Sequence, residues 1–577
     1  MAFCVNYFSM KSRYAIARLA LVLVLSLSWA RGAGADKSAI GSGVQAIAAT
    51  IHPLATDAAV QALRQGGNAI DAAIAAALTL GIVDGHNSGL GGGCFMVIRL
   101  ADGREVVIDG REKAPAAATR DMFVRDGKPD AGLSQTGALA AGVPGALAAY
   151  EYAARTFGEL PLANHLRVAA QLAEQGFALN RSYAQRLAAT AEDLRRFEAS
   201  RVALLKPDGA AWEAGEILRQ PDLAATYRAL ASEGASWFYK GPFARRTEEW
   251  MRANGGLMTA EDFGRYAIEL REPVRTTYRG YEILGFPPPS SGGVHVAQIL
   301  NILEQFKVRK LRAGSADFIH LVTEAMKLAF ADRAFWLGDP DFAKVPRGLV
   351  AKEYAAELAK RIDKRHARPV PGHATPSAAE TDLFGKHTTH FSTADRSGNW
   401  VACTATINTS FGSKVVVPGT GVVLNNQMDD FSSQPGVPNA FGLVGAEANA
   451  VAPNKRPLSS MSPTLVLRDG KPVLSLGAAG GPTIISQTVL TLLYVLDFEM
   501  PLEKALAAVR FHHQWQPDEL RLERKAGDDV IRELEKLGHH VRVVDALGAT
   551  QAVGFDESKK RFTGVADPRS EGRAEGF

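Results

Sequence analysis

The sequence predicts a mixed α/β fold in which β-sheets lie between layers of helices. Helical patterns of apolar residues dominate the stretch from about residue 143 to residue 365. Paired strand patterns joined by short turns lie near residue 100 and again after residue 388. Two apolar helices, expected at 483–495 and 502–511, follow the last pair of strands. Sheets with helices before and after them in the chain are expected to be covered by those helices.

The first expected elements are two helices and a pair of strands. Residues 55–67 and 69–80 are rich in alanine and have the apolar spacing of helices. Residues 94–100 and 105–109 have the composition of strands, and the turn Asp102-Gly103 joins them.

A glycine-rich run, residues 89–93, lies between the second helix and the first strand. A dinucleotide-binding fingerprint has the opposite order, with the strand before the helix. A phosphate-binding loop of the P-loop type needs a following Lys-Ser or Lys-Thr, which this run lacks. We therefore expect a close-packed structural turn here.

The middle of the chain is expected to be mainly helical, for example at 161–176 and 318–336. A strand at 281–285 and the turn-rich stretch 287–293 interrupt these helices. Residues 366–387 contain several prolines and few large apolar side chains, which predicts a mobile surface loop.

Two further strand pairs are expected beyond this loop. The first joins 389–394 to 400–407, and the second joins 464–468 to 472–476 around Asp469-Gly470. No internal repeat is visible in the sequence.

Composition favours an enzyme that acts on a small molecule or a peptide. The chain has 577 residues, of which 46% are hydrophobic and 22% charged, with a net charge of +4. This weak positive charge, without basic clusters interleaved with aromatic residues, argues against a nucleic acid partner. Cys94 and Cys403 are too few for a disulfide framework once Cys4 is removed with the N-terminal segment, so they are expected to be buried thiols.

The first 35 residues have the pattern of a removable signal peptide. Basic residues precede an apolar run from Leu19 to Leu27, and Ala33-Gly34-Ala35 has the small residues of a cleavage site. The expected location is therefore periplasmic or secreted, with no stable membrane span after removal. An uncleaved anchor is the alternative, and Met10 also begins a complete signal.

Four long blocks of sequence resemble the signature blocks of the gamma-glutamyltranspeptidases. They are residues 52–57, 63–73, 425–431 and 453–464, and the resemblance runs from about residue 45 to residue 569. It implies an N-terminal-nucleophile hydrolase with a four-layer αββα sandwich, in which helices flank two stacked, mostly antiparallel sheets. This agrees with the layered fold expected from the local patterns.

The resemblance also points to Thr388 as a nucleophile that the chain exposes by cutting itself after His387. A Thr-Thr pair such as Thr388-Thr389 belongs more often to an ordinary strand, and only the resemblance selects Thr388. An N-terminal threonine carries its own base, because its α-amino group has a pKa of about 7.7 to 8.0. The implied products are a large chain, 36–387, and a small catalytic chain, 388–577, which stay intertwined in one αββα unit.

The other site roles follow from the same resemblance. Thr406 would hydrogen-bond the Thr388 hydroxyl, and the backbone N–H groups of Gly480 and Gly481 would stabilise the oxyanion. The substrate's α-carboxylate would bind Arg111, whose planar fork suits carboxylates, together with the hydroxyls of Ser459 and Ser460. The residues implied for the α-ammonium group are Asp430, Asn408 and Gln427.

No metal or cofactor is expected. The pairs His387/His390 and His512-His513 lack a third ligand at a suitable spacing and are expected to be structural.

Three places depart from the family pattern. Residues 84–88 cannot be matched one by one, and Cys94 stands where glycine or another residue is common. In 435–445, which resembles a lid loop, Phe441 replaces a frequent tyrosine. Phenylalanine cannot donate a hydrogen bond, so lid closure is expected to depend on packing alone.

The resemblance implies a gamma-glutamyltransferase, or glutathione hydrolase. It would cleave the γ-glutamyl amide of glutathione or related compounds through an enzyme ester and transfer the acyl group to water, amino acids or peptides. A cephalosporin or glutaryl acylase of the same family is one alternative, against which the full set of α-amino and α-carboxylate residues argues. An unprocessed, inactive homologue that only binds is the alternative of another class.

Overall fold

The computed structural model describes residues 39–377, 379, 383–384 and 392–577. The predicted signal peptide, Cys4 and the predicted cleavage site, His387-Thr388, lie outside the described residues, as do Thr389 and His390. Among the helices of the described ranges, none combines the length and the apolar character needed to cross a membrane.

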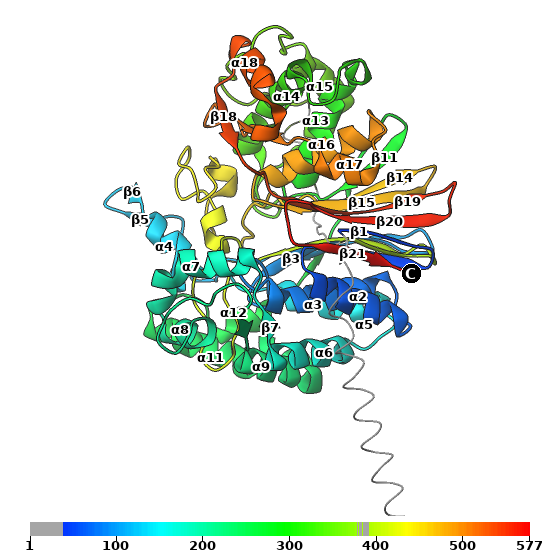
Figure 1. Ribbon diagram of the computed structural model, residues 1–577. Helices are drawn as coiled ribbons and strands as arrows, with labels where there is room; N and C mark the ends of the chain where they lie inside the picture. Colours follow the sequence, from blue (N-terminus) through cyan, green and yellow to red (C-terminus); the bar gives the residue numbers. More distant parts are fainter. Residues whose placement is uncertain (1–38, 378, 380–382, 385–391) are drawn as a thin grey trace, which may run out of the picture. The chain divides into compact units, whose positions relative to one another are not determined.

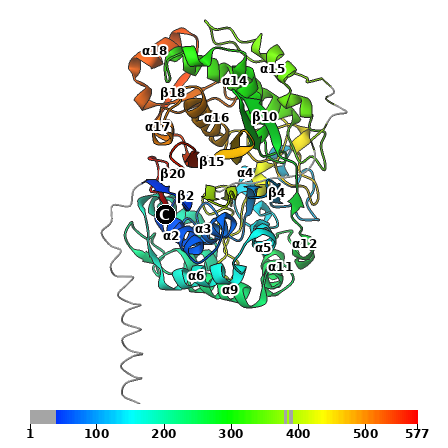
Figure 2. The same ribbon diagram turned by 90° about the vertical axis from the view of Figure 1, so that its right-hand side faces the viewer.

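Two seven-stranded sheets form the centre of the fold (Figures 1 and 2). In spatial order, the first sheet contains β1 (Ile40–Gly43), β20 (Arg561–Ala566), β19 (Ala549–Asp556), β15 (Lys471–Ala479), β14 (Thr464–Arg468), β11 (Tyr281–Gly285) and β10 (Val274–Tyr278). The second contains β21 (Arg573–Gly576), β2 (Ala46–Thr50), β12 (Ser392–Asp395), β13 (Trp400–Thr406), β3 (Gly93–Arg99), β4 (Glu105–Gly110) and β9 (Glu269–Leu270). Neighbouring strands in both sheets are antiparallel.

Helices cover the outer face of each sheet, as Figure 1 shows. The second sheet is covered first by α2 (Pro53–Arg64), α3 (Ala69–Val83), α5 (Ala146–Phe157) and α6 (Leu162–Gln175). Further helices of this layer are α7 (Arg181–Arg195), α8 (Glu198–Leu204), α9 (Pro221–Glu233), α10 (Ser236–Tyr239), α11 (Pro242–Ala253) and α12 (Ala260–Arg265). The first sheet is covered by α13 (Gly292–Glu304), α14 (Ala316–Trp336), α15 (Lys352–Ala359), α16 (Thr483–Leu496) and α17 (Leu502–Ala507).

The alternation of side chains along each central strand produces these layers. On β3, Met96 and Ile98 pack with the helices, whereas Phe95 and Val97 face the other sheet. Successive side chains of a strand point to opposite faces, so a strand buried on both faces is apolar throughout. The rings of Phe95 and Phe286 stack between the sheets with their centroids 4.5 Å apart. The predicted four-layer αββα sandwich, with two antiparallel sheets between helices, is thus confirmed.

Most of the expected elements are present with small changes in their bounds. The helices at 55–67 and 69–80 correspond to α2 and α3, and the glycine run at 89–93 is a close-packed turn as expected. A methyl group on Gly91 would lie 2.0 Å from the carbonyl oxygen of Val423, so only glycine fits there. Cys94 and Cys403 are buried free thiols.

One expected helix needs correction, and several strands are additional to those expected. The helix expected at 502–511 ends at Ala507, because Phe511 pairs with Leu522 in a small separate sheet. This sheet contains β16 (Phe511–His512), β17 (Leu520–Glu523) and β18 (Val541–Val544), with α18 (Asp528–Lys536) between its last two strands. The local patterns also do not predict the strands that complete both large sheets, which are β1, β2, β9, β10, β19, β20 and β21.

Central strands of the two sheets end at the same place in the fold. Strand β13 ends at Thr406, and β15 of the other sheet ends at Ala479, directly before Gly480 and Gly481. The two strands face each other across the sandwich, where the Ser475 hydroxyl donates to the Val401 carbonyl at 3.1 Å. Strand ends from both sheets can therefore contribute to one site.

Candidate active site

A cavity of about 110 Å³ lies where these strands end. It brings together every predicted site residue that the structure describes. They are Arg111, Thr406, Asn408, Gln427, Asp430, Ser459, Ser460, Gly480 and Gly481. His387 and Thr388 lie outside the described residues. Residues far apart in the sequence thus meet in one place with the charges and hydroxyls that the sequence led us to expect.

Arg111 is held rigidly at the wall of the cavity. It directly follows β4, and its backbone N–H donates to the carboxylate of Asp109 at 2.8 Å. Burial raises the pKa of Asp109, but the guanidinium groups of Arg456 and Arg271 outweigh this effect and hold that pKa below its usual value. The Arg111 guanidinium donates to the carbonyl oxygens of Pro457 at 3.1 Å and Leu458 at 3.3 Å. This network fixes the direction of the fork.

Asp430 is the direct partner of Arg111. The guanidinium Nη2 donates to the carboxylate Oδ2, and the side chain of Asp430 is only 11% exposed. Burial raises the pKa of Asp430 to about 6, although the nearby Arg111 opposes this shift. The carboxylate is therefore mainly ionised at neutral pH and becomes neutral in mild acid.

Glu112 adds a second buried acid beside Arg111. Burial raises the pKa of Glu112 to about 8, and the Arg111 guanidinium, 3.6 Å from it, offsets this only in part. Neither carboxyl oxygen of Glu112 has a hydrogen-bond partner among the residues that the structure describes. At neutral pH the group is mostly protonated, so it adds little negative charge to the site.

Arg333 is a lining residue that the sequence reasoning missed. It lies on α14, donates from Nη2 to the Ser460 hydroxyl at 3.0 Å and from Nε to the Ser291 hydroxyl at 2.9 Å. Burial lowers its pKa to about 10, so it stays a cation at neutral pH. Because Arg333 can only donate, the Ser460 oxygen accepts from it and the hydroxyl proton is available to another acceptor. Arg333 thus adds positive charge where a carboxylate is expected to bind.

The turn at residues 287–293 supports the neighbouring serine. The Ser291 backbone N–H and hydroxyl both donate to the Ser459 carbonyl oxygen at 2.8 Å. The Ser459 N–H in turn donates to the Pro289 carbonyl at 2.8 Å. A stretch that the sequence marked only as a break between helices therefore positions Ser459.

Gln427 and Asn408 provide oxygen and nitrogen atoms beside Asp430. Gln427 is 1% exposed, and its Oε1 has no hydrogen-bond partner within the described part of the chain. Asn408 has a φ of +80° and donates from its side chain to the Asn426 carbonyl at 3.0 Å. Its backbone N–H donates to the Thr406 hydroxyl oxygen at 2.8 Å. An unpaired buried acceptor next to a carboxylate suits a bound ammonium group.

Gly480 and Gly481 lie just beyond the ladder of β15. Their φ angles of +140° and +58° belong to conformations that favour glycine. The pair precedes α16, and its backbone faces the cavity. Two successive N–H groups in such a turn can approach a reacting carbonyl oxygen closely, as oxyanion stabilisation requires.

A turn formed by residues 439–443, hereafter the pocket turn, covers one side of the cavity. Phe441 and Leu443 line the cavity, and a methyl group on Gly481 would lie 2.7 Å from the ring of Phe441. The side-chain amide of Gln514 donates to the backbone carbonyl of Gly442 at 2.9 Å. The expectation that this segment is closed by packing alone is therefore incomplete, because hydrogen bonds also hold its backbone.

The segment 84–88, which departs from the family pattern, also contributes a residue to the cavity wall. Asn87 lines the cavity and donates to the Asp84 carboxylate at 3.0 Å. Burial raises the pKa of Asp84 to about 7. A segment that departs from the family pattern thus contributes a side chain to the wall of this cavity.

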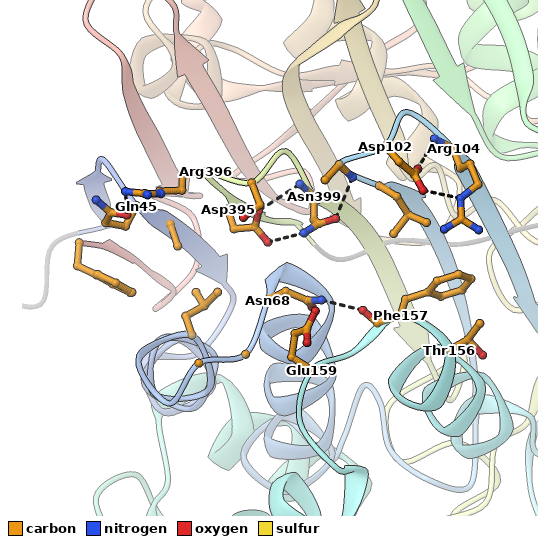
Figure 3. Close-up of a pocket in the computed structure, with 18 residues that line it drawn as sticks. Gln45, Asn68, Asp102, Arg104, Thr156, Phe157, Glu159, Asp395, Arg396 and Asn399 are labelled. Carbon is orange, nitrogen blue, oxygen red and sulfur yellow. Dashed lines mark hydrogen bonds and ion pairs between the residues drawn. The ribbon is translucent and has the colours of Figure 1, made fainter.

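A larger hollow of about 700 Å³ lies elsewhere, near the start of α3 (Figure 3). The Asn68 side chain donates to the Phe157 carbonyl at 2.7 Å, and that of Asn399 donates to Asp395 at 2.9 Å. Its lining, as far as the structure describes it, contains no histidine or cysteine. These polar groups connect parts of the fold, so the hollow shows no set of groups suited to catalysis.

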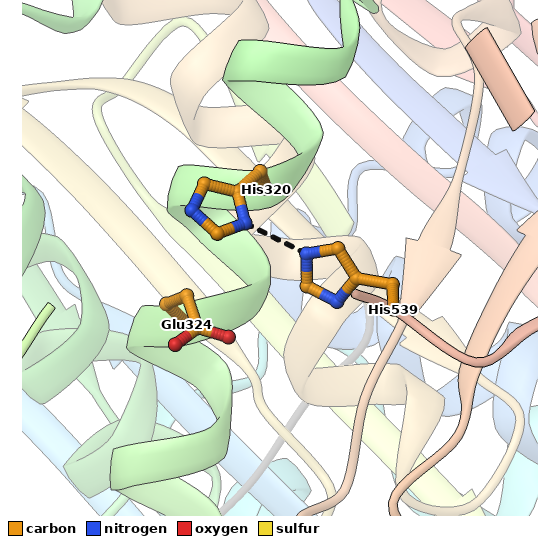
Figure 4. A group of neighbouring side chains, drawn as sticks. All are labelled: His320, Glu324 and His539. Atoms are coloured by element: carbon orange, nitrogen blue, oxygen red, sulfur yellow. Dashed lines mark hydrogen bonds between the residues drawn. The ribbon is translucent and has the colours of Figure 1, made fainter. Parts of the chain in front are cut away.

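Within the part of the chain that the structure describes, one group of side chains has the composition of a metal site. His320, Glu324 and His539 are buried, and potential ligand atoms of all three lie within 4.8 Å of one another (Figure 4). The two imidazoles share a hydrogen bond of 2.7 Å, and the Lys327 ammonium donates to Glu324 at 2.9 Å. A lysine already provides the positive charge beside this carboxylate, so we assign the group no metal.

Both histidines of the pair His512-His513 form hydrogen bonds to other side chains of the fold. His512 hydrogen-bonds Ser486 and Gln514, and His513 lies 3.0 Å from the carboxylate of Asp518.

Comparison with known proteins gives concordant similarities. Residues 55–577 match the sequence profile of a family described as Gamma-glutamyltranspeptidase. The "Glutathione hydrolase proenzyme" of Escherichia coli (strain K12) is 43% identical over 532 residues, which cover 91% of this chain and 90% of that protein.

Solved structures are similar as well. The cephalosporin acylase from Bacillus halodurans has a TM-score of 0.83 at 28% identity, with coverage of 94% of this chain and 98% of that chain. The gamma-glutamyltranspeptidase of Helicobacter pylori has a TM-score of 0.55 at 39% identity, with coverage of 56% of this chain and 93% of that chain.

Proposed function

The chain belongs to the gamma-glutamyltranspeptidase family, and we propose that the cavity at Arg111 and Asp430 is its γ-glutamyl site. The protein is an enzyme of the glutathione hydrolase type with the fold of N-terminal-nucleophile hydrolases. Glutathione and related γ-glutamyl amides are its proposed substrates. Water, amino acids and peptides are the proposed acceptors of the acyl group.

The Arg111–Asp430 pair is the observation that carries this assignment. An α-amino acid has its carboxylate and its ammonium group on the same carbon atom. The cavity presents a guanidinium and a carboxylate in direct contact, and Ser459, Ser460 and Gln427 line the same cavity. Opposite charges at this spacing complement the α-carbon end of a glutamyl group, and its γ-carbonyl can then extend toward Gly480 and Gly481.

Thr388 is the proposed nucleophile, and Thr406 its proposed partner. Thr406 is the last residue of β13 and lines the cavity, and its hydroxyl oxygen accepts the backbone N–H of Asn408 at 2.8 Å. The presence of this hydroxyl in the cavity supports the proposed hydrogen bond to the Thr388 hydroxyl.

Self-cleavage is the proposed first step. The Thr388 hydroxyl attacks the carbonyl carbon of His387, and the amide bond to the Thr388 nitrogen breaks as an ester forms. Water then hydrolyses the ester, which leaves a carboxylate on His387 and a free α-amino group on Thr388. Relatives named proenzymes, and the solved chain that covers 56% of this one, are consistent with two subunits from one precursor.

The catalytic cycle uses the same hydroxyl. The Thr388 amine accepts the hydroxyl proton as the oxygen attacks the γ-carbonyl, and the N–H groups of Gly480 and Gly481 stabilise the tetrahedral oxyanion. The amine returns the proton to the leaving nitrogen, which departs as the γ-glutamyl ester forms. Water or an acceptor amine attacks this ester in the second half of the cycle and regenerates the threonine.

We also propose that residues 1–35 are a signal peptide that is removed, and that the enzyme works in the periplasm or outside the cell. The sequence pattern of that segment supports this location. N-terminal sequencing of the large chain would reveal whether the mature protein starts near residue 36.

The acylase alternative can be separated from this proposal by one pair of substrates. The structural similarity to a cephalosporin acylase favours this acylase function as the second candidate. L-γ-glutamyl-p-nitroanilide and glutaryl-p-nitroanilide differ in the α-amino group alone. If Asp430 and Gln427 bind an ammonium group, the γ-glutamyl compound will be turned over about 100-fold or more efficiently, because glutaryl offers no ammonium group to either residue. Equal or higher efficiency with glutaryl would favour an acylase.

A further inference from the structure

The pocket turn lies over the reacting end of the cavity. Phe441 rests on Gly481, one of the proposed oxyanion donors, and Leu443 lines the same cavity. The position of this turn therefore determines how far the γ-carbonyl and the ester formed from it are shielded from solvent.

Gln514 holds the backbone of this turn. Its side chain is buried, and its amide nitrogen donates to the carbonyl oxygens of Gly442 at 2.9 Å and Phe441 at 3.3 Å. Gln514 is 72 residues away from Gly442 in sequence, so this contact joins two separate segments. Because both acceptors in the turn are backbone atoms, the contact does not depend on which side chain stands at position 441.

A chain of hydrogen bonds fixes Gln514 in turn. Its amide oxygen lies 3.0 Å from Nε2 of His512, and Nδ1 of His512 lies 2.6 Å from the Ser486 hydroxyl. The amide oxygen can only accept, so His512 carries its proton on Nε2 and accepts from Ser486 at Nδ1. Ser486 belongs to α16, the helix that starts directly after Gly481-Pro482. The chain thus links the helix behind the oxyanion glycines to the turn in front of them.

A second contact ties the other end of the turn to the charged part of the site. The Ala440 N–H donates to the carboxylate of Asp429 at 2.9 Å, and Asp429 directly precedes Asp430. Loss of the Gln514 contact would therefore leave the turn attached at Asp429 and free to open at Phe441 and Gly442.

We propose that Gln514 is a positioning residue that keeps the pocket turn closed over Gly481. In this role it strengthens the binding of the γ-glutamyl group and sets the proportion of ester that water intercepts before an acceptor amine does. The inference depends on the γ-glutamyl function proposed above. It assigns Gln514 no part in self-cleavage or in proton transfer.

Gln514→Glu tests this role with little change in size. At about pH 8.5, well above an ordinary carboxyl pKa, the glutamate still accepts from His512 but presents oxygen to the two carbonyls in place of N–H donors. Ser486→Ala breaks the same chain two links away but leaves the direct contacts to the turn in place, so it should have a smaller effect in the same direction. Gln514→Leu provides a second, uncharged variant.

Four quantities would be measured for each protein: the extent of the split into two chains, KM and kcat for γ-glutamyl-p-nitroanilide, and the ratio of hydrolysis to transfer with glycylglycine. For Gln514→Glu we expect complete splitting, a KM about five- to tenfold higher, a kcat within about twofold and a larger hydrolysed fraction. Gln514→Leu should change in the same direction. Ser486→Ala should shift KM and the ratio in the same direction, by clearly less than either Gln514 variant.

Failure of this inference can be told apart from failure of the proposed function. A wild-type protein that neither splits nor releases the anilide would overturn the function itself. With an active wild type, an unchanged KM and ratio in both Gln514 variants would overturn the role of Gln514. That role would also be overturned if Ser486→Ala matched Gln514→Glu, or if neither Gln514 variant split, because a residue that positions the turn is not needed for maturation.

Discussion

Arg111 and Asp430 lie 319 residues apart in the sequence, yet the guanidinium of one donates directly to the carboxylate of the other. Both belong to the wall of a single cavity between the ends of β4 and a short loop helix, Gln427–Asp430. The pair places a positive and a negative group side by side at the place where an amino acid's carboxylate and ammonium are proposed to bind.

Replacing Arg111 by lysine should impair substrate binding severely. Lysine keeps the charge but cannot donate at once to Asp430, Pro457 and Leu458 as the guanidinium does. We expect kcat/KM for γ-glutamyl-p-nitroanilide to fall by about 100-fold or more, mainly through KM, since a buried, hydrogen-bonded charge pair is disrupted. Steady-state kinetics on fully split protein would check this. A variant within about threefold of wild type would remove Arg111 from the binding site.

The pKa of Asp430 predicts a loss of substrate binding in mild acid. This pKa is raised to about 6, so the carboxylate becomes protonated below that pH and no longer pairs with an ammonium group. KM for the γ-glutamyl substrate should therefore rise as pH falls from 7 to 5. In Asp430→Asn, KM should be high throughout and lose this dependence. A wild-type KM that stays flat over the interval would contradict the assigned role.

The raised pKa of Glu112 predicts that the stability of the fold falls as pH rises. An ordinary salt-bridged acid produces the opposite dependence. The pKa of Glu112 rises to about 8 in the folded state, from an ordinary value of 4.5. Between these values the folded state holds a proton that the unfolded state has lost, so stability falls as pH rises, by at most about 1.4 kcal/mol per pH unit. Glu112→Gln should remove this slope. The melting temperature of the wild type should therefore fall relative to that of Glu112→Gln between pH 5 and pH 8. A constant difference between the two melting temperatures would contradict the raised pKa of Glu112.

Arg333 should contribute to substrate binding through charge and through Ser460. Arg333→Gln removes the cation beside the proposed carboxylate site, and we expect KM to rise about tenfold or more while the protein still splits. Arg333→Lys should retain part of the affinity, because it keeps the charge but loses one of the two contacts to Ser460 and Ser291. Equal kinetics for both variants and wild type would show that Arg333 is only structural.

Local sequence patterns were sufficient for the central part of the fold. The hairpin of β14 and β15 has alternating apolar residues on either side of Asp469-Gly470, whose φ angles of +50° and +75° are those of the expected tight turn. The helices α2, α3 and α14 likewise follow their apolar spacing. Such elements can be predicted because apolar residues recur every two residues in a strand and about every 3.6 residues in a helix, and this spacing is a property of the local sequence.

Other features depend on contacts that no local pattern records. Arg333 lies in a helix whose sequence shows only an apolar pattern, and its role arises because α14 passes Ser291 and Ser460. Gln514 follows two histidines and contacts a turn 72 residues away in sequence. The resemblance to the family supplied Arg111 and Asp430, but their direct contact, and the burial that shifts the pKa of Asp430 and Glu112, required the folded arrangement.

Mass spectrometry of the purified wild type and of Thr388→Ala tests the central claim most directly. The wild type should contain two chains, the smaller of which begins with a free amine at Thr388, and it should release p-nitroaniline from the γ-glutamyl substrate. Thr388→Ala should remain one chain and show no turnover above background, because one hydroxyl performs both the cut and the acyl transfer. A Thr388→Ala protein that still splits and still turns over substrate would contradict the account.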